Sequence, residues 1–106
     1  MILEGIRILD LSRFLPGAYC TYLFARFGAE VWKLEPPGGD PARAWGPCRA
    51  GESTYFYVVN GSKKSISLNL KAEGAKEVFF RLVEEVDILI EGFRPGVMDR
   101  LGVGYK

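Results

Sequence analysis

Cationic loops follow two short apolar runs of this chain. The segment 91–96 (EGFRPG) comes directly after the apolar run 86–90, and the segment 10–17 (DLSRFLPG) follows a similar run at 6–10. In open α/β sheets, anionic cofactors bind outside the carboxyl ends of the strands. Two loops of this kind predict a ligand that carries phosphate.

A second group of cations surrounds the run 64–70, which alternates polar and apolar residues. Lys63 and Lys64 stand at its start and Lys71 follows its end. Lysine binds phosphate as a flexible point charge, whereas arginine binds it with a planar fork. Taken alone, these lysines are better explained as a solvated charged turn.

Two arginines and three apolar residues complete the candidate site. Arg94 and Arg100 lie on either side of a Pro-Gly pair. One of them could therefore reach a ligand while the other pairs with a nearby carboxylate. Leu68, Leu70 and Phe93 would fit a flat base that stacks beside a phosphate.

The composition argues against several other functions. The chain has 2 cysteines, no histidine and no G-x-S-x-G motif, which leaves no nucleophilic constellation, disulfide framework or metal-ligand set. The G-x-G-x-x-G fingerprint is absent before Tyr22, so NAD binding is not expected although Glu35 ends a strand where a ribose-binding acid belongs. A net charge of +1 does not favour nucleic acid, and no apolar run approaches the roughly 20 residues of a membrane span. We expect a cytoplasmic chain that binds a ligand and carries no catalytic or metal-binding residue of its own.

The elements that would position these residues alternate between strand and helix. The pattern predicts strands at 6–10, 29–35, 64–70 and 86–90, and helices at 16–27, 72–85 and 97–101. Residues 36–53 form a long irregular segment, and 54–59 are ambiguous between strand and helix. This order predicts an α/β, Rossmann-like doubly wound fold with a mainly parallel sheet of about four strands. The barely begun last helix suggests that residues 1–106 are one segment of a larger fold.

Several ordered motifs give the whole chain a resemblance to the class III CoA-transferases, the carnitine dehydratase and bile-acid-inducible family. This family includes formyl-CoA transferase and α-methylacyl-CoA racemase. The resemblance rests on the segments 3–13 (LEGIRILDLSR), 27–40 (FGAEVWKLEPPGGD), 60–71 (NGSKKSISLNLK), 91–96 (EGFRPG) and 99–102 (DRLG).

This resemblance implies an amino-terminal lobe that binds coenzyme A or acyl-CoA as substrate, with no metal. Matched motif by motif, the CoA-contacting positions fall on Leu15, Pro16, Leu68, Asn69, Leu70, Lys71, Gly92, Phe93, Arg94 and Arg100. Members of the family are cytoplasmic interlocked homodimers about four times longer than this chain. They move CoA between carboxylic acids through a thioester on an enzyme aspartate, a form of covalent catalysis. That aspartate matches no residue of this chain, so the chain alone is expected to be inactive.

Two departures and two alternatives remain. Gly92 stands where relatives often carry asparagine, so a side-chain amide is lost, and Pro36 stands where some carry an arginine. A racemase that exchanges a proton at the α-carbon of an acyl-CoA belongs to the same superfamily. A truncated chain could instead bind nucleotide weakly or serve only in dimerisation.

Overall fold

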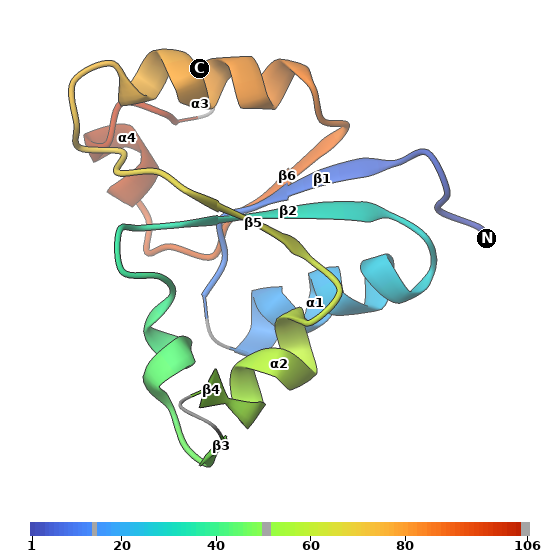
Figure 1. Cartoon of the computed structure of the whole chain (residues 1–106). Coiled ribbons are helices and arrows are strands. Elements are labelled where there is room, and N and C mark those ends of the chain that lie inside the picture. The colour runs from blue at the N-terminus through green and yellow to red at the C-terminus, as the bar shows by residue number, and fades with distance from the viewer. Residues whose placement is uncertain (14, 50–51, 105–106) are drawn as a thin grey trace.

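A parallel sheet lies between two layers of helices (Figure 1) in the computed structural model, which describes residues 1–13, 15–49 and 52–104. The sheet consists of β1 (Arg7–Asp10), β2 (Glu30–Glu35), β5 (Lys64–Ser67) and β6 (Ile88–Ile90), in the order β5-β2-β1-β6. Every neighbouring pair in it is parallel. The predicted α/β class and the parallel sheet of about four strands are therefore confirmed.

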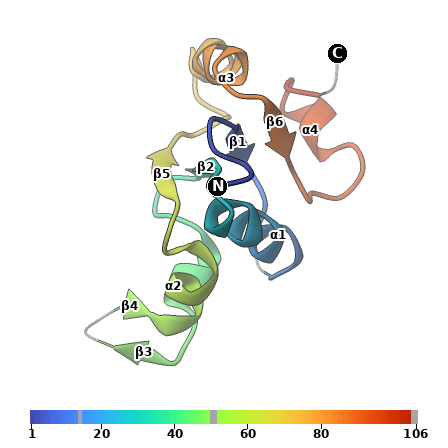
Figure 2. The ribbon, with the colours of Figure 1, turned by 90° about the vertical axis from the view of Figure 1, so that its right-hand side faces the viewer.

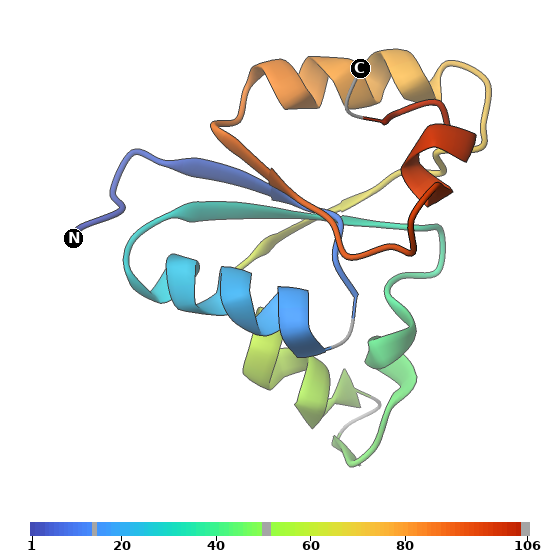
Figure 3. The same ribbon diagram turned by 180° about the vertical axis from the view of Figure 1, so that it is seen from behind.

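The helices cover opposite faces of the sheet. α1 (Leu15–Arg26) and α2 (Thr54–Asn60) lie on one face, and α3 (Ala75–Glu84) and α4 (Val97–Arg100) lie on the other (Figures 1 and 3). Figure 2 shows α1 and α3 on opposite sides of the strands. α1 leads from β1 to β2, whereas α3 leads from β5 back to β6. The strand order therefore reverses between β1 and β6, and ligands of open α/β folds bind beside such a reversal.

Strand β1 carries the centre of the core. Ile8 and Leu9 are both fully buried, and because side chains alternate along a strand they enter different apolar clusters. Ile8 packs with Val31 in one cluster, and Leu9 packs with Leu34 and Phe79 of α3 in the other. Hydrophobic packing on both faces fixes β1 and β2 in the middle of the sheet.

Helix α1 approaches the sheet through small side chains. Ala18 and Thr21 are buried, whereas the larger Tyr19, Leu23 and Phe27 are exposed. Small residues allow the helix to lie close to the strands, and the outward aromatic side chains leave an apolar surface.

The irregular segment between β2 and α2 contains a short 3-10 helix, η1 (Pro41–Ala44), and a hairpin of β3 (Cys48–Arg49) and β4 (Glu52–Ser53). The ambiguous residues 54–59 are helical because Ser53 caps α2. Its hydroxyl accepts a hydrogen bond from the Phe56 N–H at 3.1 Å. Such a cap satisfies an amide that the first helical turn leaves unpaired.

Three predicted boundaries were wrong. Strand β5 ends at Ser67, and the Leu68 N–H makes a last bond to the Glu35 carbonyl at 2.9 Å before the chain turns away. Helix α3 begins at Ala75 rather than 72, because Gly74 adopts a left-handed φ of 81°. The strand expected at 86–90 is β6, which begins only at Ile88. Ile88 is 42% exposed because β6 is an edge strand of the described sheet.

Candidate functional site

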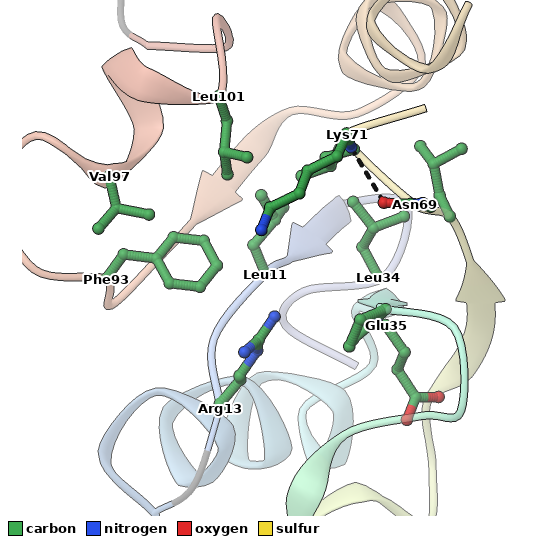
Figure 4. A pocket seen from close by; sticks show the side chains of 12 residues that line it. Leu11, Arg13, Leu34, Glu35, Asn69, Lys71, Phe93, Val97 and Leu101 are labelled. Atoms are coloured by element: carbon green, nitrogen blue, oxygen red, sulfur yellow. Dashed lines mark hydrogen bonds between the residues drawn. The ribbon is translucent and has the colours of Figure 1, made fainter. Parts of the chain in front are cut away.

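A cavity of about 390 Å³ lies over the carboxyl ends of the strands (Figure 4). Each strand of the four-stranded sheet, or the loop after it, contributes to the wall, and α4 contributes Val97. Its lining consists of Leu11, Arg13, Leu34, Glu35, Pro36, Leu68, Asn69, Leu70, Lys71, Phe93, Val97 and Leu101. We call this space the main cavity. It lies where the order of the strands predicts a ligand.

Two cations face each other inside this cavity, whose wall is otherwise mostly apolar. Figure 4 shows the side chains of Arg13 and Lys71 directed into the space bordered by Phe93, Leu11 and Leu34. The Arg13 guanidinium carbon lies 5.4 Å from the centre of the Phe93 ring, a cation–π distance. A ligand with a flat apolar part and anionic groups matches this lining.

A second cavity of about 590 Å³ adjoins the main cavity beside α3 and α4. The two share Leu70, Lys71 and Leu101. Arg100 lines the second cavity together with Lys71, so these two cations face the same space.

The structure brings together six of the ten residues that the resemblance assigned to CoA. Leu68, Asn69, Leu70, Lys71 and Phe93 line the main cavity, and Arg100 lines the second. Residues 68–71 lie in the loop after β5 rather than along the strand, and the Asn69 carboxamide accepts the Lys71 N–H at 3.0 Å. Contact with CoA stays a prediction for all of them.

Of the other four residues, Gly92, Arg94 and Pro16 do not line these two cavities. Gly92 and Arg94 are exposed on the loop after β6. That loop turns outward where the Glu91 carboxylate accepts the Phe93 N–H at 3.0 Å. Pro16 is exposed in the first turn of α1, and Leu15 begins α1 with a side chain outside the described part of the structure.

The first loop is held by a buried carboxylate at the end of β1. Asp10 is fully buried and accepts hydrogen bonds from the Ser12 N–H at 2.8 Å and from the Thr21 hydroxyl at 2.6 Å. The Lys63 ammonium lies 3.1 Å from the same carboxylate. Burial lowers the pKa of Lys63, and the charge of Asp10 opposes that shift. Lys63 is therefore a structural ion-pair partner rather than a ligand-binding cation.

A second buried pair ties the long segment after β2 to the same loop. The Lys33 ammonium lies 2.9 Å from the Asp40 carboxylate and donates to the Ser12 carbonyl at 3.1 Å. Lys64, by contrast, pairs on the surface with Glu30 at 2.8 Å. Of the lysines around the 64–70 run, only Lys71 reaches the cavities.

Glu35 borders the main cavity, but its carboxylate is already engaged. Arg43 donates to it at 2.7 and 2.8 Å, the Asp40 N–H donates at 2.8 Å, and Ser65 donates through its hydroxyl. Burial raises the pKa of Glu35, but these hydrogen bonds outweigh burial and lower the pKa to about 2. Figure 4 shows the carboxylate directed away from the cavity. A ribose hydroxyl would have to displace these donors, which agrees with the absence of a dinucleotide fingerprint.

Sequence reasoning missed part of the lining. Leu11, Leu34, Val97 and Leu101 were not assigned to the site, and Arg13 was included only as part of the cationic loop 10–17. A signal was present, because Leu11 and Leu34 stand at the carboxyl ends of predicted strands. The contribution of Val97 could not be foreseen, since the sequence does not fix how the short helix α4 folds back over the sheet.

Two further findings concern the described ranges 1–13, 15–49 and 52–104. Among these residues, no group of three or more histidine, cysteine or acidic side chains could hold a metal ion. None of the helices they form is long and apolar enough to cross a membrane.

Comparison with known proteins identifies relatives along nearly the whole chain. The model of CoA-transferase family III matches residues 3–106. The chain is 46% identical over 104 residues to acetyl-CoA:oxalate CoA-transferase of Acetobacter aceti, covering 97% of the chain and 27% of that protein. It is 43% identical over 106 residues to succinyl-CoA:glutarate CoA-transferase of Homo sapiens, covering 98% of the chain and 24% of that protein. The chain thus spans about a quarter of the length of the curated relatives it matches.

Solved structures agree with these relatives. A hypothetical protein of Mycobacterium tuberculosis superposes with a TM-score of 0.89 at 40% identity, covering 97% of this chain and 28% of that chain. A CAIB/BAIF family protein of Brucella suis also gives a TM-score of 0.89, at 36% identity, with 97% of this chain and 29% of that chain covered. The family model, the relatives and the shared fold together show that this chain belongs to CoA-transferase family III.

Proposed function

We propose that this chain is the CoA-binding part of an enzyme that moves CoA between carboxylic acids through an aspartyl thioester. The observation that carries the proposal is the main cavity at the strand-order reversal, where an apolar wall faces Arg13 and Lys71. The relatives act on acetyl-CoA and oxalate, or on succinyl-CoA and glutarate, according to their names. An acyl-CoA and a carboxylic acid are therefore the proposed substrates.

In this proposal, each group in the cavity has a separate task. The side chains of Leu68, Leu34 and Phe93 form apolar surface against which an adenine ring can stack and exclude water. Lys71 and Arg13 supply positive charge for phosphate oxygens. The lobe would hold the nucleotide end of the substrate and leave the thioester end free to reach a reacting group.

The aspartates support a binding role rather than a complete catalyst. Asp10 and Asp40 are buried in ion pairs with lysines, and neither lines the main cavity. Asp87 accepts the Arg7 N–H at 2.9 Å. Glu35 borders the cavity but is neutralised by Arg43. The nucleophile of the transfer would then come from residues other than these, and we propose that this chain alone does not transfer CoA.

The racemase alternative has no supporting observation, because the relatives named above are transferases and nothing in the comparisons favours racemisation. We further propose a cytoplasmic homodimer for the assembled enzyme. The exposed Tyr19 and Leu23 of α1, with Phe27 directly after it, support a surface that another part of the assembly covers.

Calorimetric titration of the 106-residue chain with CoA tests the proposed binding. We expect saturable binding by the unaltered chain and a weaker affinity in Lys71→Gln, because Lys71 lines both cavities. Arg26→Gln is the matched control, since Arg26 is exposed in the last turn of α1 and lines neither cavity. Absence of a saturable signal at millimolar CoA would contradict the proposal.

A further inference from the structure

Three cations from three separate elements converge on the second cavity. Lys71 comes from the loop after β5, Lys76 from the first turn of α3, and Arg100 from the end of α4. Among the residues that the structure describes, none of the three takes part in an ion pair, and Glu73 is the acidic residue in the lining. Three cations around one acid leave an excess of positive charge, which favours an anionic ligand.

The position of Lys76 depends on a glycine after α4. Gly102 has a φ of +77°, and a Cβ atom at this position would clash with the Lys76 ammonium. The lysine side chain therefore extends from α3 across to the residue that follows α4. This places its charge between the two helices, on the same hollow as Arg100.

We propose that the second cavity binds the 3′-phosphate of coenzyme A and that Lys76 is a specificity-determining residue for this group. This inference rests on the proposed function, because it assumes that the main cavity holds the adenylate. The 3′-phosphate is bonded to the ribose that carries the base. The 3′-phosphate must therefore lie close to the base without overlapping it. The two cavities have this relation, because they are neighbours that share Leu70 and Lys71.

The charge of the group also fits the site. A phosphate monoester carries between about −1.5 and −2 charges near pH 7, with acceptor oxygens that can bind several cations at once. The diphosphate of CoA lies on the other side of the ribose and needs cations of its own. Arg13 in the main cavity can serve it, while Lys71 stands between the two spaces.

The test compares CoA with dephospho-CoA, which lacks only the 3′-phosphate, by calorimetric titration of the chain. We expect the unaltered chain to prefer CoA by about tenfold or more, the scale of one charge-assisted hydrogen bond. Lys76→Gln should weaken CoA binding by about three- to tenfold and leave the affinity for dephospho-CoA unchanged. Arg81→Gln is the control on the same helix, because its ion pair with Glu77 is exposed and outside the cavity.

The outcomes separate the two proposals. If the chain binds neither ligand, the proposed CoA-binding function fails and this inference fails with it. If the chain binds both ligands equally, or if Lys76→Gln weakens both by the same factor, the inference alone is overturned. A preference for CoA that is reduced in Lys76→Gln and kept in Arg81→Gln would support the assignment of Lys76 to the 3′-phosphate, and an undiminished preference in Lys76→Gln would overturn it.

Discussion

The buried pair of Lys33 and Asp40 should show strong thermodynamic coupling. Their side chains are 2% and 1% exposed, and the ammonium and carboxylate lie 2.9 Å apart. Lys33→Met would leave the Asp40 carboxylate buried without its counter-charge, which typically costs about 3–5 kcal/mol. Asp40→Asn keeps an oxygen that can accept the Ala42 N–H, now bonded at 2.8 Å, but leaves the ammonium unpaired.

The double variant Lys33→Met/Asp40→Asn removes both charges together. Its loss of stability should therefore be no greater than that of the worse single variant. The coupling energy then equals at least the smaller of the two single losses, about 3 kcal/mol or more. A domain of this size has a free energy of unfolding of about 5–15 kcal/mol, so the single variants remain folded enough to measure.

Urea denaturation followed by circular dichroism measures these free energies. Lys64→Met is the control, because its ion pair with Glu30 lies at the surface, where such pairs contribute about 0–1 kcal/mol. A coupling energy below about 0.5 kcal/mol would refute the reasoning, since it would mean that the two groups act independently.

Three further predictions concern binding, pH and association. Arg100→Ala should weaken CoA binding by about 1–3 kcal/mol in calorimetry, as expected for one lost charge-assisted hydrogen bond, and an unchanged dissociation constant would remove Arg100 from the site. The pKa of Glu35 is lowered from 4.5 to about 2, because hydrogen bonds from Arg43 and Ser65 outweigh the effect of burial. Its contribution to stability is therefore complete above pH 4.5 and is lost as the pH falls toward 2, so unfolding midpoints of Glu35→Gln should vary less with pH across this window than those of the unaltered chain. The exposed Phe27, Phe80 and Ile88 should make the chain self-associate in sedimentation velocity experiments, and a concentration-independent monomer would count against this expectation.

Local signals predicted the strands and helices well because they depend on neighbouring residues. Gly28 follows α1 and has a φ of +106°, a conformation that favours glycine, so the turn into β2 could be predicted from one glycine. In the folded chain a Cβ at this position would also lie 2.8 Å from the Met1 side chain. The helix at 54–59 stayed ambiguous because its aromatic residues suit either structure, and the capping bond of Ser53 decides the outcome.

The candidate site was predictable in position but less so in detail. The cationic loops after β1 and β6 could be placed at one edge because parallel strands share the direction of their carboxyl ends. The partner of Lys63 could not be predicted, since Asp10 lies 53 residues away and only the packing of α1 and α2 brings them together. The same limit applies to Lys76, whose place in the second cavity depends on how α4 folds back.

The charges beneath the main cavity and those inside it should respond differently to ionic strength. Two ion pairs, Lys63 with Asp10 and Lys33 with Asp40, are buried away from solvent, so dissolved ions screen them little. Lys71 and Arg100 line open hollows and are screened readily. Added salt should therefore weaken nucleotide binding without destabilising the loops that form the cavity. The salt dependence of the dissociation constant then reports the contacts between these cations and the phosphates of the ligand.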